Sequence, residues 1–210
     1  NNNGTKLFSE EKNPMLCDHP NIYNIKDVFY GNEKIELSYR PQKIIVSDYG
    51  QGDLIDFVSK EQLITNPKHK IKKHLIQQMT SSINYLQKKQ IIHRDIKLEN
   101  FIYINNLRNG NKTKQVTLKL IDFEFSSKYH KGQLFNNICG SPTYVAPEVI
   151  TGEKYNYMAD NWSLGICAYM LISGQKPLSN YVLKKIIKRS AVKKMYTIDY
   201  NTPYWDIQPL

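Results

Sequence analysis

The sequence has little cysteine, and its three cysteines lie far apart. Cys17, Cys139 and Cys167 form no CxxC pair within the 210 residues. Neither a disulfide framework nor a paired-cysteine zinc site is therefore expected. We expect reduced, buried thiols in a cytoplasmic protein, with the nucleus as the alternative location.

Long apolar runs are absent as well. The longest run covers residues 166–172, whereas a helix that crosses a bilayer needs about 20 residues. Residues 1–10 contain no basic segment that leads into an apolar core, which a secretion signal would show. We expect no membrane partner.

Arginine is scarce in a chain that is otherwise basic. Only 4 of the 29 basic residues are Arg, although the formal net charge is +10. Proteins that bind nucleic acids gather Arg and aromatic residues on one face, whereas the lysines here are scattered. Two lysine clusters, residues 68–74 and 184–194, are expected to be solvated helix faces. Nucleic acid is therefore not expected as a partner.

The first third of the chain has the composition of strands. Residues 22–30, 34–39 and 43–49 are rich in β-branched and aromatic side chains. Residues that form turns, Gly31-Asn32 and Pro41, separate these segments and predict three strands. A short helix over residues 9–16 precedes them, interrupted by Pro14.

Helical periodicity appears after residue 53. Leu75, Met79, Ile83 and Leu86 recur at spacings of four, four and three, which predicts one apolar stripe on a helix over residues 69–88. Strands first and helices later indicate a small sheet lobe followed by a larger helical lobe. The other predicted segments are helices at 159–173 and 182–193, strands at 91–92, 101–104 and 116–121, an exposed hairpin loop at 105–114 and an irregular stretch at 123–147.

Three motifs occur in order in the second half of the chain. Residues 93–100 read HRDIKLEN, residues 122–124 read DFE, and residues 146–148 read APE; DNWSLG follows at 160–165. In this order and spacing they resemble the catalytic motifs of eukaryotic protein kinases. The wording CGSPTYVAPE at residues 139–148 most resembles the calmodulin-dependent and AMP-activated kinase group, which is of the Ser/Thr type.

The resemblance implies an α+β fold with the two lobes of a protein kinase. It assigns residues 1–49 to a remnant of the small β lobe with the start of the hinge, and residues 50–210 to the mainly helical large lobe. Residues that match the family's Gly-rich loop, its strand lysine and its last helices are missing. We therefore expect a partial catalytic domain with the small lobe truncated, which is not expected to be active alone.

The same resemblance assigns the catalytic roles. Asp95 would accept or orient the proton of the substrate hydroxyl, and Lys97 would place a cation beside the transferred phosphoryl group. Asn100 and Asp122 would bind Mg²⁺, which prefers oxygen ligands. Ser141, in the loop that receives the substrate, would bond to Asp95 and Lys97.

Two further sets of residues are implied to contact or support the site. Asp48 and Gly50 in the hinge, Asp53 at the ribose, and Glu99 beside the catalytic loop would join Lys97, Asn100 and Asp122 around ATP. His93 is expected to stack on Phe123 in a structural role, and Asp160 to accept backbone N–H groups of the catalytic loop.

Two departures from the family pattern carry chemical meaning. Glu124 replaces a glycine, so the segment that holds Asp122 should flip less freely. Residues 130–140 contain no hydroxyl side chain, so Arg94 lacks the phosphorylated partner that it has in many kinases.

The resemblance implies an ATP- and Mg²⁺-dependent kinase that phosphorylates Ser and Thr residues of protein substrates. The alternative is a catalytically silent, kinase-like binding module. The missing phosphate loop, the missing strand lysine and Glu124 favour the alternative. The intact set of Asp95, Lys97, Asn100 and Asp122 favours the enzyme.

Overall fold

A computed structural model of the chain describes residues 17–35, 38–61, 63, 69–106 and 115–177. The predicted helices at 9–16 and 182–193 and the lysine cluster at 184–194 lie outside these residues. The elements, in chain order, are β1 (Ile25–Ile35), β2 (Ser38–Ser47), α2 (Leu54–Lys60), α3 (His69–Lys88), β3 (Ile91–Ile92), the 3₁₀ turn η1 (Leu98–Asn100), β4 (Phe101–Asn106), β5 (Gln115–Leu120), β6 (Ser127–Lys128), α4 (Pro147–Ile150) and α5 (Ala159–Ser173).

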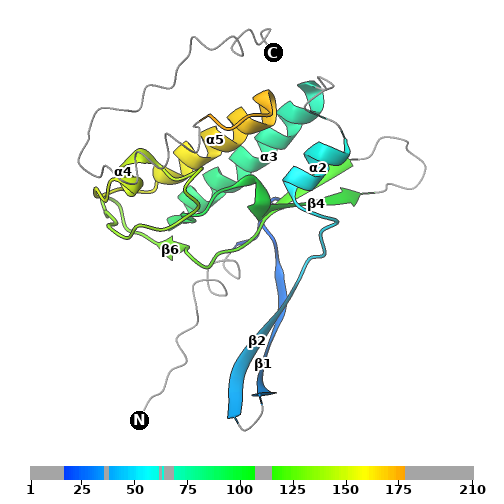
Figure 1. The fold of residues 1–210 in the computed structure, drawn as a ribbon, viewed down its shortest axis with the longest axis vertical. Coiled ribbons are helices and arrows are strands. Elements are labelled where there is room, and N and C mark those ends of the chain that lie inside the picture. The colour runs from blue at the N-terminus through cyan, green and yellow to red at the C-terminus, as the bar shows by residue number, and fades with distance from the viewer. Residues whose placement is uncertain (1–16, 36–37, 62, 64–68, 107–114, 178–210) are drawn as a thin grey trace.

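The first two strands form one long hairpin that extends away from the helices (Figure 1). β1 and β2 pair antiparallel, from Ile25 opposite Ser47 to Ile35 opposite Ser38. The prediction of three strands was wrong, because Asn32 pairs with Pro41 within the ladder. Both strands are edge strands, where proline is tolerated because its missing N–H can be the one that faces away from the partner.

The helical body is built on two long helices that lie side by side, α3 and α5 (Figure 1). The predicted stripe on α3 is confirmed, because Leu75, Met79, Ile83 and Leu86 are all buried. β4 and β5 pair antiparallel beneath α3, with Phe101 opposite Leu120, as the predicted strands at 101–104 and 116–121 require. The segment at 123–147 is less irregular than expected, because β6 pairs with β3.

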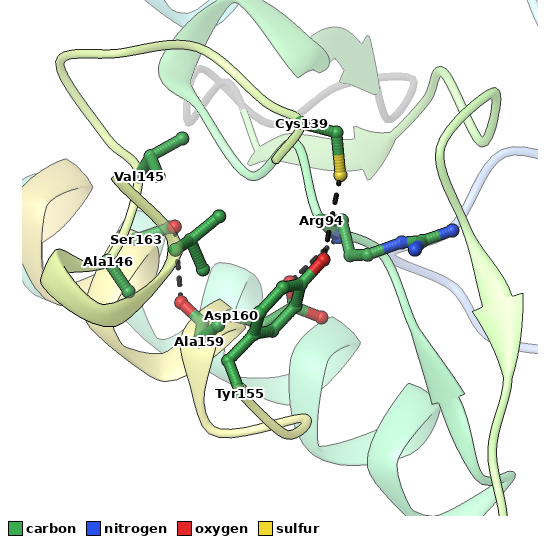
Figure 2. A pocket seen from close by; sticks show the side chains of 9 residues that line it. Arg94, Cys139, Val145, Ala146, Tyr155, Ala159, Asp160 and Ser163 are labelled. Atoms are coloured by element: carbon green, nitrogen blue, oxygen red, sulfur yellow. Dashed lines mark hydrogen bonds between the residues drawn. The ribbon is translucent and has the colours of Figure 1, made fainter. Parts of the chain in front are cut away.

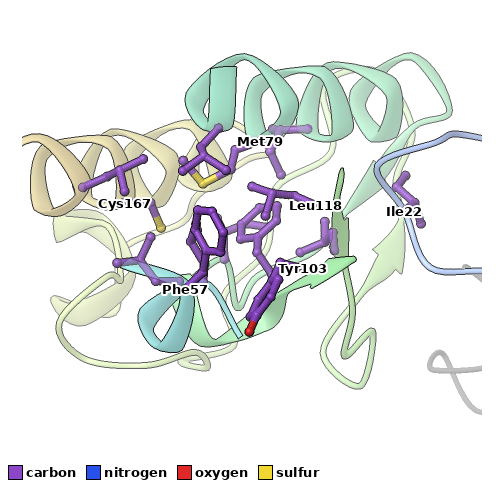
Figure 3. Close-up of a cluster of buried hydrophobic side chains, with 14 of the residues drawn as sticks. Ile22, Phe57, Met79, Tyr103, Leu118 and Cys167 are labelled. Atoms are coloured by element: carbon purple, nitrogen blue, oxygen red, sulfur yellow. The ribbon is translucent and has the colours of Figure 1, made fainter. Parts of the chain in front are cut away.

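Side chains from five different elements meet in the main core (Figure 3). Phe57 of α2 lies 5.1 Å from the ring of Tyr103 on β4. Met79 of α3, Leu118 of β5 and Cys167 of α5 complete the centre, and each of these three is fully buried. This core fixes α2, α3 and α5 against the β4–β5 ribbon, whose neighbouring loops carry the polar motifs.

A buried polar network joins the segment before β1 to this body. Asn21 Nδ2 donates to Gln78 Oε1 at 2.8 Å and to the Leu118 carbonyl at 2.9 Å. The same Gln78 oxygen accepts from the Leu118 N–H at 2.8 Å, and Gln78 Nε2 donates to the Val116 carbonyl at 3.0 Å. One glutamine on α3 therefore connects the entry to the hairpin with the edge of β5.

The lysine cluster at the start of α3 differs in part from its prediction. Lys70, Lys73 and His74 are exposed, as a solvated face requires, but Lys72 is buried. Its ammonium donates to the Ile172 carbonyl in the last turn of α5 at 3.0 Å. A cation is favourable there because the carboxyl end of a helix carries partial negative charge.

Two expectations drawn from absences can be compared with the described residues. Cys17, Cys139 and Cys167 are free thiols; Cys17 and Cys167 are buried as predicted, whereas Cys139 is only partly buried. Among the described helices, none combines the length and the apolar character that crossing a bilayer requires.

We predict that Gln78→Leu destabilises the fold while Gln77→Leu does not. Gln78 is buried and makes three hydrogen bonds, whereas Gln77, its neighbour on α3, is exposed. Each buried polar group that loses its partner costs about 1–3 kcal/mol, so we expect Gln78→Leu to lower the free energy of unfolding by about 2–4 kcal/mol. The matched Gln77→Leu variant should stay within about 0.5 kcal/mol of wild type. Urea unfolding of both variants provides the measurement, and equal effects would contradict the assigned role of the network.

Candidate active site

The loop between β3 and η1 is held by one buried carboxylate. Asp160, in the first turn of α5, accepts the His93 N–H at 2.7 Å and the Arg94 N–H at 2.8 Å. Arg94 adopts a left-handed backbone conformation, with φ of 70°, which is costly for a residue with a side chain. Burial raises the pKa of Asp160 to about 6, against the effect of the two amides. The hydrogen bonds that the resemblance implied for Asp160 are present, and they turn the loop at Arg94.

Asp95 follows that turn, and its carboxylate is fully hydrogen-bonded. Oδ2 accepts from Lys97 Nζ at 2.6 Å and from Asn100 Nδ2 at 3.2 Å. Oδ1 accepts both the backbone N–H and the side-chain hydroxyl of Ser141, each at 2.9 Å. The structure thus brings Asp95, Lys97, Asn100 and Ser141 together, although Ser141 is 46 residues from Asp95.

The charge of Asp95 follows from these contacts. Burial works to raise the pKa of Asp95, but the hydrogen bonds from Lys97 and Ser141 outweigh it and hold the pKa below its usual value. The carboxylate is therefore ionised at neutral pH and can act as a proton acceptor.

Lys97 keeps donor capacity beyond Asp95. Its ammonium also donates to Ser141 Oγ at 3.2 Å. An ammonium has three N–H groups, so one remains to meet a negatively charged group. The side chain is 21% exposed, which leaves it accessible from outside the loop.

His93 lies under the loop in a structural position. Its ring is fully buried and packs edge-to-face on Phe123, with centroids 4.8 Å apart. Nδ1 accepts from the Asp95 N–H at 3.3 Å, and the Nε2 group lies 3.1 Å from the Ile121 carbonyl, so the neutral ring with the proton on Nε2 satisfies both partners. Burial lowers the pKa of His93 to about 4. The expected stacking on Phe123 is present.

An open cleft of about 590 Å³ lies between the base of the hairpin and the helical body. Its lining includes five of the seven residues that the sequence assigned to a nucleotide, namely Asp48, Gly50, Asp53, Glu99 and Asp122, whereas Lys97 and Asn100 are not among the lining residues. Tyr23, Ile45, Ile102 and Ile121 supply apolar walls. A concave, mostly apolar site with a few polar groups at its edge is typical of a small-ligand pocket.

Asn100 and Asp122 offer a donor set that fits a magnesium ion. Asn100 uses its amide nitrogen for the Asp95 carbonyl at 2.9 Å, so its amide oxygen is the group that a cation would meet. Asp122 has a left-handed backbone, with φ of 63°, and lines the cleft. Carboxylate and amide oxygens suit Mg²⁺. Within the described residues no cluster of three or more His, Cys, Asp or Glu side chains could hold a metal, so further ligands would come from phosphate and water.

The hinge contains interactions that the sequence did not predict. Asp48 forms ion pairs with Lys119 of β5 at 3.0 Å and with Lys26 of β1 at 3.5 Å. Burial works to raise the pKa of Asp48, yet its contacts with Lys119 and the Asn24 N–H hold the pKa below its usual value. Asp53 caps α2 by accepting from the Asp56 N–H at 2.8 Å, a pattern that its position before an apolar helix could have revealed.

Glu99 also has an unforeseen partner. The Tyr144 hydroxyl donates to Glu99 Oε2 at 2.9 Å. Burial, followed by the nearby Glu99 charge, raises the pKa of Tyr144 well above its usual value. Tyr144 is buried, so this bond ties the loop that carries Ser141 to the edge of the nucleotide cleft.

The fold and the site together define a class of protein. A hairpin and a helical body border a cleft, and the loop that contains Glu99 of its lining also carries a carboxylate, an ammonium and an amide bonded to one another. This is the arrangement of a protein kinase domain, which the motifs resembled.

Comparison with known proteins agrees with that class: residues 1–208 match the family model described as "Protein kinase domain". The chain belongs to this family. It is 33% identical over 174 residues to "NUAK family SNF1-like kinase 2" of Homo sapiens. It is 34% identical over 173 residues to "SNF-related serine/threonine-protein kinase" of Rattus norvegicus, and 30% identical over 213 residues to "DNA damage response protein kinase DUN1" of Saccharomyces cerevisiae. The predicted relation to the AMP-activated group of Ser/Thr kinases is confirmed.

The alignments cover most of this chain but a smaller part of each relative. They span 82%, 81% and 96% of the chain in the human, rat and yeast comparisons, and 24%, 21% and 40% of the relatives. The family is therefore established, while the division at residues 49 and 50 into two lobes remains a prediction.

We predict that His93→Phe changes how stability depends on pH. The unfolded chain binds a proton on histidine near pH 6.5, whereas folded His93 binds it at about pH 4. Between these values the unfolded state carries more protons, so stability is lost as the pH falls. Without this group, the variant should gain about 3 kcal/mol relative to wild type between pH 6.5 and 4.

In the wild-type protein and in the His93→Phe variant alike, Asp160 changes the stability with pH in the opposite direction to His93. Its folded pKa of about 6 exceeds its usual 3.8, so its buried charge favours unfolding as the pH rises through that range. Subtracting the free energy of unfolding of the wild type from that of the variant at each pH removes the contribution of Asp160. Chemical unfolding at several pH values measures the difference, and a difference that does not vary with pH would contradict the burial of a neutral His93.

Proposed function

We propose that this chain is the catalytic domain of an ATP-dependent protein kinase that phosphorylates Ser and Thr side chains. The observation that carries the proposal is the hydrogen-bonded cluster of Asp95, Lys97, Asn100 and Ser141, which adjoins Glu99 of the cleft lining along the chain. Phosphoryl transfer depends chiefly on positioning and on neutralisation of charge, and this cluster supplies an acceptor, a cation and an amide oxygen within one hydrogen-bonded unit.

Asp95 is suited to receive the substrate hydroxyl. Its depressed pKa keeps the carboxylate ionised, and its four donors orient it. A substrate hydroxyl would replace one of these donors. Ser141 Oγ is a good candidate for exchange because its backbone N–H still bonds to Asp95 after the side chain moves.

The remaining residues would hold the nucleotide. ATP would supply the phosphoryl group, and Mg²⁺ would neutralise charge on the phosphates. Asn100 and Asp122 would hold the metal, and the third N–H of Lys97 would meet the transferred phosphoryl group. Asp48, Gly50 and Asp53 line the outer part of the cleft, where adenine and ribose would lie.

Restriction to Ser and Thr rests on the pairing of Lys97 with Ser141. The two groups lie 3.2 Å apart and share Asp95. A relative in the rat is named a serine/threonine-protein kinase. Protein substrates with Ser or Thr are the corresponding partners.

Glu124 does not obstruct this role. It is exposed on a turn, and its N–H lies 3.4 Å from Asp122 Oδ1. Phe123 is fully buried, and its carbonyl accepts from the Ser126 N–H at 3.0 Å and from Ser126 Oγ at 2.6 Å. The turn therefore holds Asp122 at the cleft with a glutamate in the glycine position.

We predict that Asp95→Asn abolishes transfer but retains nucleotide binding. Loss of a positioned proton acceptor should lower the rate by about 10²–10⁴-fold. Asp122→Asn should instead weaken the Mg²⁺-dependent part of ATP binding, because the amide is neutral. Transfer from labelled ATP to Ser and Thr peptides and calorimetric titration with Mg-ATP provide the two measurements.

Asp27→Asn is the matched control, since Asp27 is exposed on β1 and its side chain bonds only locally to the Val28 N–H among the contacts described. It should leave binding and transfer unchanged. Both measurements use the full-length protein, because the described chain is not expected to be active alone. If the full-length wild-type protein binds Mg-ATP but transfers no phosphate, it is a silent binding module. If it neither binds nor transfers, the assignment of the cleft is wrong.

A further inference from the structure

The Arg94 side chain contacts the activation segment, residues 122–148, at two places. The Arg94 Nε group donates to the Phe125 carbonyl at 2.6 Å. Its guanidinium lies over the ring of Phe135, 5.2 Å from the centroid. The described part of the chain contains no ion pair between Arg94 and a carboxylate. The cation is thus engaged by a carbonyl and by an aromatic face, which attracts cations through its quadrupole, and its side chain also interacts with the Tyr155 hydroxyl.

Phe135 is fixed independently of charge. Its N–H donates to the Tyr155 carbonyl at 2.7 Å, and its carbonyl accepts from the Tyr155 N–H at 2.9 Å. The ring is buried in a second apolar cluster with Ile92 and Val149. Backbone pairing and packing therefore present the face of Phe135 to Arg94.

Tyr155 secures the residues that follow. Its hydroxyl donates to the Asn137 carbonyl at 2.7 Å and lies 3.8 Å from Cys139 Sγ. Figure 2 shows the Tyr155 hydroxyl pointing between Cys139 and Arg94, in a small pocket that Val145 and Asp160 also line. One tyrosine thus holds the segment at both Phe135 and Asn137.

The segment then passes directly over the catalytic loop. A Cβ on Gly140 would lie 2.5 Å from the Arg94 carbonyl oxygen, and Gly140 has φ of 94°. Only glycine fits this approach. The next residue, Ser141, donates to Asp95. We name the contacts among Arg94, Phe135, Tyr155 and Asn137 the aromatic clamp. The clamp holds the part of the segment that leads through Gly140 to Ser141, and Ser141 bonds to the proton acceptor Asp95.

Phosphorylation would be the other way to order the segment around Arg94, but residues 130–140 offer no hydroxyl to phosphorylate. Ser126 is buried, with its hydroxyl bonded to the Phe123 carbonyl. We propose that Phe135 and Tyr155 are positioning residues that order the substrate loop around Arg94 without phosphorylation of the activation segment. The inference rests on the proposed kinase function.

Hydrogen exchange of phosphatase-treated full-length protein tests the clamp without any assay of activity. The Phe135 and Ser141 amides should be protected in wild type, because both are hydrogen-bonded. Phe135→Leu, which removes the aromatic face, and Tyr155→Phe, which removes only the hydroxyl, should each raise exchange in peptides covering 135–141 at least tenfold. Leu134→Ala is the control, since Leu134 is 54% exposed. Protection of α3 should not change in any variant, which shows that the fold is intact.

A double-variant comparison separates the contact from simple filling of space. If Phe135 acts through Arg94, adding Arg94→Met to Phe135→Leu should raise exchange little beyond the single variant. If the two effects multiply, Phe135 acts by packing alone and the proposal is overturned.

Activity provides the last comparison. Phosphatase treatment should leave peptide phosphorylation by the wild-type protein within twofold. The proposal fails if treated protein loses protection of 135–141 and mass spectrometry shows that protection returns only with phosphorylation at Ser126 or Ser127. If the protein transfers no phosphate under any condition, the proposed function fails, while the exchange measurements still decide whether the clamp exists.

Discussion

The buried carboxylate of Asp160 is the constraint on which the site depends. It accepts two consecutive backbone amides, those of His93 and Arg94, and so stabilises a left-handed residue at Arg94 that the chain would otherwise avoid. That turn sends Asp95 toward the cleft and the Arg94 side chain toward the activation segment. Because α5 carries Asp160 and packs on α3, the main core determines where the catalytic loop lies. Loss of this carboxylate would leave the His93 and Arg94 amides without acceptors, which would destabilise the loop that carries Asp95.

Hydrogen bonds reach the Asp95 carboxylate from two parts of the chain. Lys97 and Asn100 approach Asp95 from its own loop, while Ser141 approaches from the activation segment. The hydrogen bonds from Lys97 and Asn100 follow from the spacing of the motif. The hydrogen bonds from Ser141 require the activation segment to be ordered over many residues, and Phe135 and Tyr155 make contacts that order it. The hydrogen bonding of Asp95 therefore depends on the order of the activation segment, although the two are far apart in the sequence.

How far the sequence could predict this arrangement differs between elements. The apolar stripe on α3 was predictable because its spacing matches one helix face, and the four side chains are buried. The hairpin was not, because Gly31 and Pro41 usually end strands, yet a two-stranded ribbon tolerates both. Lys72 was misplaced with its solvated neighbours, since its partner, the Ile172 carbonyl, lies 100 residues away. Local pattern predicts local structure, and a partner distant in sequence leaves no local trace.

The sequence by itself determined which residues carry the proposed chemistry. Asp95, Lys97, Asn100 and Asp122 stand at the spacing of a known catalytic motif, and three of them lie within six residues of one another, so their proximity follows from the short loop. Only the tertiary structure decided how these residues are held. The Asp48 ion pairs with Lys26 and Lys119, the bond from Tyr144 to Glu99 and the aromatic clamp around Arg94 join segments that are far apart along the chain. Such contacts depend on which side chains the core brings within a few ångströms, and that distance is a property of the packed chain.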